Sequence, residues 1–234
     1  MKYILDVHCH SISSGHAYST ITENIKYAQK IGLKLLALTD HAPKMPNACG
    51  NLYFLNLNIL PKKFEDIEIL MGVELNILDE TGKIDLPNRI LKNLDLKIAS
   101  LHPPCIEPAD EKFNTNAVVN AMKNEMVNII GHLGDPRYPI NIQEIVKAAK
   151  ETNTLIEINN SSLNPNNSRA GGEKIVLNIL EECKKRNVSI VLGSDAHYHT
   201  YIGNFDNAIT LLEKCDFPEE LVVYTSITKL KNFL

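Results

Sequence analysis

The sequence predicts an α/β fold with a parallel sheet, either an α/β barrel or a doubly wound sheet. Short apolar runs alternate with segments of helical periodicity about seven times along the chain, and this alternation is typical of βαβ units. The runs are apolar at consecutive positions, which indicates strands that are buried on both faces. Because no linker or repeated segment interrupts the pattern, one domain is expected over residues 1–234.

Seven strands and six helices are predicted in alternation. The strands cover residues 3–7, 33–38, 67–73, 96–100, 128–130, 155–158 and 189–192. The helices cover residues 22–31, 87–93, 116–124, 142–151, 173–186 and 205–213. Thr22 has the position of an N-cap for the first helix, and Pro87 fits the first turn of the second. The loop over residues 42–63 is long for a compact domain, which favours a functional role.

Composition limits the location and the partners of the protein. The formal net charge is −4 and aromatic residues are 6% of the chain, so nucleic acid is not an expected partner. No apolar run approaches the length that crosses a bilayer, and the N-terminus does not resemble a signal peptide. The five cysteines are scattered and form no C-x-x-C pair, which is typical of a reducing cytoplasm and argues against a thiolate zinc site.

Residues that bind metal ions follow six of the seven predicted strands. His8 and His10 end the first strand, and side chains two residues apart on a strand project to the same face. The carboxyl ends of parallel strands meet at one rim, where α/β barrels build their active sites, so these residues are expected to lie together. The candidate metal ligands are His8, His10, His16, His41, Glu74, His102, His132, Asp195 and His197.

The nine candidates also limit the metal and the reaction. Imidazole and carboxylate ligands suit Zn²⁺, Mn²⁺ or Fe. One tetrahedral zinc takes about four ligands, so nine candidates predict two or three ions. Only two of the nine are carboxylates, so bound divalent ions would leave a positive pocket that suits phosphate. Clustered metals activate water for in-line displacement, and the predicted reaction is therefore phosphoester hydrolysis.

Several short motifs contain the candidate ligands: DVHCH at residues 6–10, TDH at residues 39–41, the isolated His102, and GSDAH at residues 193–197. Together they resemble the motifs of the PHP (polymerase and histidinol phosphatase) domain superfamily. Three further stretches resemble the YcdX-type stand-alone phosphatases: EINNSS at residues 157–162, GHLGDP at residues 131–136 and SRAGG at residues 168–172. The resemblance covers essentially the whole chain.

The resemblance implies a distorted, TIM-like (β/α)7 barrel with three metal ions, Zn²⁺ first and Mn²⁺ or Fe as alternatives. The first ion would be held by His8, His10, Glu74 and Asp195. Glu74 would bridge to a second ion, completed by His102 and His132, and the third would be held by His16, His41 and His197. The chain departs from the family pattern in GHLGDP, where Pro and Asn are expected in place of Leu133 and Asp135.

The function that the resemblance implies is hydrolysis of small-molecule phosphate monoesters through a metal-activated hydroxide. Two related activities stay open: a phosphodiesterase or exonuclease of the PHP type, and histidinol-phosphatase. A metal-binding protein without catalysis is the alternative from another class. A homo-oligomer also stays open, because some relatives are oligomeric.

Three more residues are candidate catalytic groups. Arg169 follows the sixth predicted strand, and a guanidinium matches phosphate bidentately, so Arg169 is the candidate phosphate clamp. Asp40 adjoins the candidate ligand His41, points away from it by strand alternation, and is expected to support a ligand on another strand. His199 is the candidate proton donor to the leaving group.

Overall fold

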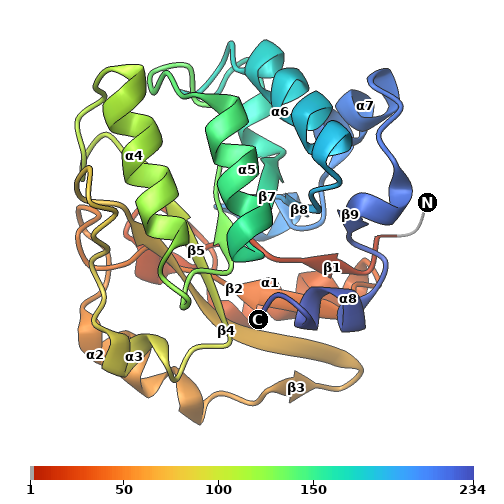
Figure 1. The fold of residues 1–234 in the computed structure, drawn as a ribbon. Coiled ribbons are helices and arrows are strands. Elements are labelled where there is room, and N and C mark those ends of the chain that lie inside the picture. Colours follow the sequence, from red (N-terminus) through yellow and green to blue (C-terminus); the bar gives the residue numbers. More distant parts are fainter. Residues whose placement is uncertain (1–2) are drawn as a thin grey trace.

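The computed structural model describes residues 3–234, and their strands form one continuous sheet (Figure 1). The strands are β1 (Leu5–Asp6), β2 (Leu35–Leu38), β3 (Lys63–Phe64), β4 (Ile67–Asn76), β5 (Leu96–Ser100), β6 (Ile129–Ile130), β7 (Leu155–Asn159), β8 (Ile190–Gly193) and β9 (Val222–Val223). Their order is β1-β2-β4-β5-β6-β7-β8-β9, with every neighbouring pair parallel, and β3 is antiparallel to the start of β4.

Backbone hydrogen bonds connect the two ends of this sheet. The Ile4 N–H donates to the Tyr224 carbonyl over 3.2 Å, and the Asp195 N–H donates to the His8 carbonyl over 2.8 Å. The sheet therefore curls into a distorted barrel, and of the two predicted arrangements the barrel is confirmed and the doubly wound sheet is wrong.

Two hydrophobic clusters explain why the strands are apolar at consecutive positions. One cluster lies inside the barrel. It contains side chains such as Leu5 of β1, Val7 just after β1, and Ile98 of β5. The larger cluster lies between the sheet and the helices and includes Ile69 and Leu75 of β4. Each long strand therefore buries both faces, as the sequence pattern predicted.

The helices surround the sheet, and α4, α5 and α6 stand side by side along one part of it (Figure 1). The α-helices are α1 (Ile21–Lys30), α2 (Asn51–Asn56), α3 (Asn88–Leu91), α4 (Glu111–Met122), α5 (Ile142–Thr152), α6 (Glu173–Arg186), α7 (Asp206–Lys214) and α8 (Ile227–Lys231). The short α8 places Leu230 in the inner cluster, and so it closes one end of the barrel.

Four short elements were not predicted: β3, β9, α2 and α8. Each strand has two residues and each helix five or six, which is too short for a periodic pattern to emerge. The predicted helix over residues 116–124 is wrong at its start, since α4 begins at Glu111. The Asp110 side chain there accepts a hydrogen bond from the Phe113 N–H over 2.8 Å and caps the helix.

The first helix also begins earlier than predicted. Thr20, not Thr22, is its N-cap, because the Thr20 hydroxyl accepts from the Glu23 N–H while the Glu23 carboxylate accepts from the Thr20 N–H. This reciprocal pair is a capping box. Thr22 is an exposed residue in the first turn. Over residues 3–234, no helix is both long enough and apolar enough to span a membrane.

Substitution of the two threonines should separate the cap from its neighbour. We expect Thr20→Ala to lower the free energy of unfolding by about 1 kcal/mol, a decrease in Tm of about 2–4 °C for a chain of this size. Thr22→Ala should leave Tm unchanged or slightly higher, because alanine has the better helix propensity. Thermal unfolding followed by circular dichroism measures both, and equal losses would contradict the assignment of Thr20 as the cap.

Candidate metal centre

The structure brings the nine predicted ligands together at the carboxyl ends of the strands. Glu74 lies near the end of β4, and its backbone pairs with that of His41, which follows β2. His102 and His132 follow β5 and β6, and Asp195 and His197 follow β8. Seven of the nine are buried, His197 is partly buried, and His16, in the loop after β1, is exposed. The parallel strands therefore bring together the metal-binding side chains that were predicted to follow them.

The Glu74 carboxylate lies at the centre of this cluster, and its two oxygens face different histidines. Oε2 lies 3.4, 3.5 and 2.8 Å from imidazole nitrogens of His8, His10 and His41. Oε1 lies 3.2 and 2.9 Å from the Nε2 atoms of His102 and His132. A carboxylate with imidazoles on both sides has the arrangement of a bridging ligand.

A third group of donors lies around Asp195. Its Oδ1 is 3.2 Å from His10 Nε2 and 3.5 Å from His197 Nδ1. Donor atoms of His10, His41 and His197 lie within 4.8 Å of one another, and the His16 ring centroid is 4.9 Å from that of His41 and 4.8 Å from that of His197. His41 thus faces both Glu74 and the His16–His197 pair, instead of belonging to one group alone.

Several of these donor atoms are buried without a hydrogen-bond partner. Among the residues that the structure describes, the unpartnered buried atoms include His8 Nε2, His10 Nε2, His41 Nδ1 and Glu74 Oε2. Leaving such groups unsatisfied costs about 1–3 kcal/mol each. All four point into one cluster of imidazole and carboxylate donors, which is the ligand set that Zn²⁺, Mn²⁺ and Fe prefer. The residues present therefore fit a multinuclear metal site.

Burial and neighbouring imidazoles keep two of the histidines unprotonated. The pKa of His10 is held well below its usual 6.5 by burial and by the nearby His197 and His41. Burial, and after it the nearby His41 and His197, likewise lower the pKa of His16 to about 4. A metal binds the neutral imidazole, so protons do not compete for these nitrogens at neutral pH.

The carboxylates of the cluster are ionised for a related reason. Burial works to raise the pKa of Glu74 and of Asp195, but the facing imidazoles, and for Asp195 the Arg169 guanidinium, hold both pKa values well below the usual range. Burial works to lower the pKa of His8, and the carboxylates of Glu157, Glu74 and Asp195 outweigh it and raise that pKa. The same negative charges attract a metal cation to the position of that proton.

Three ligand histidines are oriented by residues that sequence reasoning missed. Their Nδ1 atoms form hydrogen bonds on the side away from the cluster: His8 with Glu157 (2.6 Å), His102 with Asn76 (2.7 Å) and His10 with Ser14 (3.0 Å). Such partners fix the orientation of a metal-binding imidazole and raise its basicity. A signal was present for two of them, since Asn76 follows Glu74 by two residues on one strand and Glu157 is an acid within an apolar run.

Asp40 supports His10 through Ser14. The Asp40 carboxylate accepts hydrogen bonds from the Ser11 N–H (2.6 Å), the Ser14 hydroxyl (2.7 Å) and the Tyr53 hydroxyl (2.6 Å). Ser14 in turn contacts His10 Nδ1. The contacts of Asp40 thus lead through Ser14 to His10, a candidate ligand on another strand, which is the kind of support that was predicted for Asp40.

Gly193, on the neighbouring strand β8, makes room for Glu157. A Cβ on Gly193 would lie 1.9 Å from Glu157 Oε1. The carboxylate also accepts from the backbone N–H of His132 over 2.9 Å. His132 has a φ of 30°, a conformation that is unusual outside glycine and that this hydrogen bond helps to hold. Glu157 therefore positions two candidate ligands at once.

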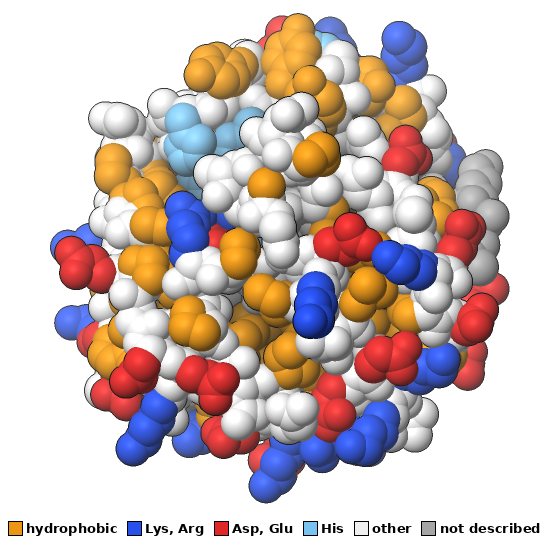
Figure 2. Space-filling model, turned by 90° about the horizontal axis from the view of Figure 1, so that it is seen from above, with side chains coloured by type: hydrophobic (Ala, Val, Ile, Leu, Met, Phe, Trp, Pro, Cys, Tyr) orange, Lys and Arg blue, Asp and Glu red, His pale blue; other side chains and the backbone are white. Residues whose placement is uncertain are grey.

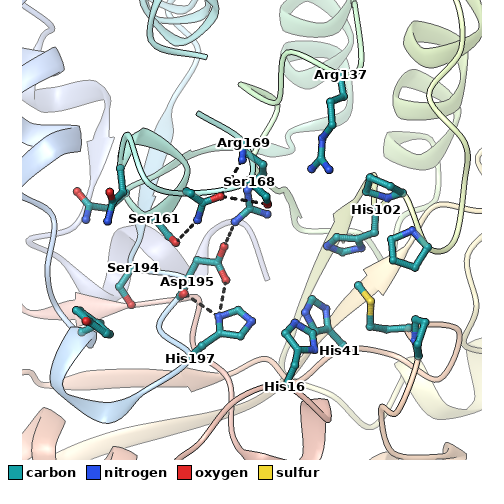
Figure 3. Close-up of a pocket in the computed structure, with 18 of the residues that line it drawn as sticks. His16, His41, His102, Arg137, Ser161, Ser168, Arg169, Ser194, Asp195 and His197 are labelled. Carbon is teal, nitrogen blue, oxygen red and sulfur yellow. Dashed lines mark hydrogen bonds and ion pairs between the residues drawn. The ribbon is translucent and has the colours of Figure 1, made fainter. Parts of the chain in front are cut away.

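The cluster opens into a pocket of about 850 Å³. Figure 3 shows Arg169 and Asp195 on one side of it, with His16, His41 and His102 on the other. Seen from above, histidine side chains lie in a hollow of the surface beside a basic side chain (Figure 2). The long loop before β3 contributes Met45 to the wall, in agreement with a functional role for that loop.

Of the remaining predicted residues, Arg169 reaches the pocket and His199 does not line it. The Arg169 Nη2 forms an ion pair with Asp195 Oδ2, and its Nε is buried without a partner among the described residues. The His199 Nδ1 instead forms a 2.9 Å hydrogen bond with Ser19, and its ring packs against Tyr27. This position gives no support to His199 as a proton donor.

The fold and the site define an α/β-barrel protein with a histidine and carboxylate cluster at the carboxyl rim. The model of the PHP domain matches residues 6–168. The chain therefore belongs to the PHP domain family, as its motifs predicted.

Similar proteins span the whole chain. A probable phosphatase of Clostridium novyi (strain NT) is 50% identical over 234 residues, 100% of this chain and 95% of the relative. A probable phosphatase of Caldanaerobacter subterraneus subsp. tengcongensis is 52% identical over 235 residues, 100% of this chain and 92% of the relative. Among solved structures, histidinol phosphate phosphatase from Lactococcus lactis, complexed with zinc, L-histidinol and phosphate, superposes with a TM-score of 0.61. At 21% identity, over 92% of this chain and 95% of that one, this likeness shows a shared fold.

Filling the space beside Glu157 should weaken metal binding. We expect Gly193→Ala to displace the Glu157 carboxylate, remove the orienting partner of His8, and lower the affinity for Zn²⁺ by about 10–100-fold. Calorimetric titration of chelator-treated protein measures this affinity. Gly50→Ala is the matched control, because Gly50 has a φ of −83° and an added Cβ there meets nothing within 4 Å. Wild-type zinc affinity in a folded Gly193→Ala variant would contradict the role assigned to Glu157.

Proposed function

We propose that the protein is a metal-dependent phosphatase that hydrolyses small-molecule phosphate monoesters. The observation that carries the proposal is the set of unpartnered buried donor atoms on His8, His10, His41 and Glu74, in a cluster that adjoins the pocket lined by His41 and Arg169. Such a pocket suits metal cations on one side and a phosphate anion on the other. The names of the full-length relatives, probable phosphatases, support the same activity.

The nine predicted ligands would hold up to three divalent ions. His8, His10, Glu74 and Asp195 would hold the first, Glu74 with His102 and His132 the second, and His16, His41 and His197 the third. The distances from the two Glu74 oxygens to the imidazoles support the bridging role. When bound, such ions supply Lewis-acid stabilisation of phosphate charge and lower the pKa of water toward about 7. Zn²⁺ suits these donors, as do Mn²⁺ and Fe.

The residues of the chain have separate tasks in this proposal. Arg169 binds the phosphate of the ester, because its buried Nε–H has no protein acceptor among the described residues and a guanidinium pairs well with phosphate oxygens. Its ion pair with Asp195 orients it toward the cluster. Asp40, acting through Ser14, holds His10 in position. His199 lies outside the pocket lining, so the proposal assigns it no proton transfer.

Hydrolysis of p-nitrophenyl phosphate tests the proposed activity directly. Protein reconstituted with Zn²⁺ or Mn²⁺ should turn over this monoester faster than bis-p-nitrophenyl phosphate, and a chelator should remove the activity. Preference for the diester would move the substrate class to phosphodiesters. Absence of turnover on both esters, and on a panel of metabolite monoesters, with metal bound, would overturn the proposal.

Two ligand variants connect the activity to the cluster. His8→Ala and Glu74→Ala should each lose turnover and bind less metal, because each removes a donor from the centre of the site. His199→Ala is the matched control for metal content, since it removes a histidine that does not line the pocket. Metal content is measured by elemental analysis, and wild-type content in the two ligand variants would contradict the cluster.

Arg169 has a distinct kinetic signature. We expect Arg169→Ala to raise KM for phosphate monoesters about tenfold or more, because a charge-assisted hydrogen bond to the substrate is lost. Metal content should stay near that of the wild type. Arg186→Ala is the control, since Arg186 pairs with Glu182 on α6 and does not line the pocket. Unchanged kcat and KM in Arg169→Ala would remove the phosphate-clamp assignment.

A further inference from the structure

A second arginine, Arg137, lines the same pocket and belongs to none of the groups described above. Its guanidinium points toward the space between Arg169 and His102 (Figure 3). Apart from histidines, the charged residues of the pocket lining are Arg137, Arg169 and Asp195, and Asp195 is already paired with Arg169. Arg137 therefore adds a second guanidinium to the wall of the pocket, and its ion-pair partner, Asp135, lies outside the lining.

The Arg137 side chain is held in place by Asp135. Arg137 Nε donates to Asp135 Oδ1 over 2.9 Å, Nη2 donates to Oδ2 over 2.6 Å, and the Arg137 backbone N–H also donates to Oδ1. Asp135 is 3% exposed, and its N–H donates to the carbonyl of His132. A short turn thus connects a candidate metal ligand to the arginine. Asp135 is also one of the two positions, with Leu133, at which the chain departs from the family pattern, and here its carboxylate holds Arg137.

The contact with Asp135 leaves part of the guanidinium available. A guanidinium has five N–H donors, and Asp135 takes those on the Nε and Nη2 edge. No other residue in the described part of the chain accepts a side-chain hydrogen bond from Arg137, and its side chain is 38% exposed. The Nη1 edge is therefore free for an anionic group of a ligand, held at low entropic cost because the side chain is already fixed.

Arg137 serves a different part of the ligand from Arg169. Arg169 contacts the candidate ligand Asp195 directly, which puts it beside the metal cluster. The ion pair of Arg137 is with Asp135, outside the ligand set. A pocket of about 850 Å³ is large for a phosphate group alone and is within the range of whole small-molecule sites. The wall at Arg137 is thus available to the rest of the substrate.

We propose that Arg137, held by Asp135, binds a second anionic group of the substrate, so that the preferred esters carry a carboxylate or a further phosphate besides the scissile phosphate. This inference rests on the proposed phosphatase function and specifies its substrate class. Arg137 is a specificity-determining residue in this proposal, and Asp135 is a positioning residue that acts through it.

Matched ester pairs test this preference. Phosphate release is measured for phenyl phosphate, for 3- and 4-carboxyphenyl phosphate, and for 4-(phosphonomethyl)phenyl phosphate. The two types of added group distinguish a carboxylate from a phosphate as the preferred anion. We expect the best anionic ester to exceed phenyl phosphate in kcat/KM by about tenfold or more. In Arg137→Gln this ratio should fall toward one, and in Arg137→Lys it should be partly restored.

Two further variants define the roles of the pair. Asp135→Asn should lower the same selectivity ratio while Arg137 keeps its charge, because the guanidinium loses its fixed position; a merely structural role would not change the ratio. Arg89→Gln is the control, since Arg89 is an exposed arginine on α3 that does not line the pocket. A ratio near one in the wild type, or an unchanged ratio in a folded Arg137→Gln variant, overturns the proposal.

A binding measurement separates this inference from the proposed function. Calorimetry on the metal-loaded protein compares benzylphosphonate with 4-carboxybenzylphosphonate and 4-(phosphonomethyl)benzylphosphonate, which are not hydrolysed. Tighter binding of a dianionic ligand that depends on Arg137, without turnover of any ester, would support the anion site and overturn the phosphatase. Turnover of esters without any preference for the second anion, in rate or in binding, would support the phosphatase and overturn the role of Arg137.

Discussion

The whole site depends on one buried carboxylate, that of Glu74. It is 1% exposed, and five imidazoles from four other segments of the chain surround its two oxygens. A carboxylate buried without partners is strongly destabilising, so Glu74 requires strands that deliver those imidazoles to within about 3.5 Å. The parallel order of β1, β2, β4, β5 and β6 does this, because all of these strands end at one rim. Burial of Glu74 therefore requires a fold in which these strand ends lie side by side.

Around Glu74, residues outside the ligand set hold several of the candidate ligands in position by hydrogen bonds. Glu157 occupies a space that a side chain at Gly193 would fill, and it holds both the His8 ring and the backbone of His132. Asp40 holds Ser14, which holds His10. Among the described residues, His8 Nε2 and His10 Nε2 have no hydrogen-bond partner, so the two rings are oriented while the nitrogens that face the cluster stay available for a metal ion. Preorganisation of this kind raises metal affinity and fixes the geometry of the reaction.

The long elements were predictable because their patterns repeat over enough residues. Strands such as β4 and β5 bury both faces, so their apolar runs were visible, and α6 has the predicted bounds because fourteen residues carry a clear period. β9 and β3 were missed since two residues contain no periodicity. The start of α1 was misplaced because two threonines are close together, and only the geometry shows that Thr20 pairs with Glu23.

The sequence by itself determined which metal-binding side chains end the predicted strands. His8, His10, His41, Glu74, His102, His132 and Asp195 all come at the ends of apolar runs that predict buried strands. Parallel strands end at a common rim, so their meeting followed from the pattern alone. Only the tertiary structure decided which side chains form hydrogen bonds to the candidate ligands and which side chains line the pocket. Glu157 reaches His8 across a separation of 149 residues, while His199, two residues beyond His197, is turned toward Ser19. Contacts between distant segments depend on side-chain direction and on the space that neighbouring residues leave, and neither is present in a one-dimensional pattern.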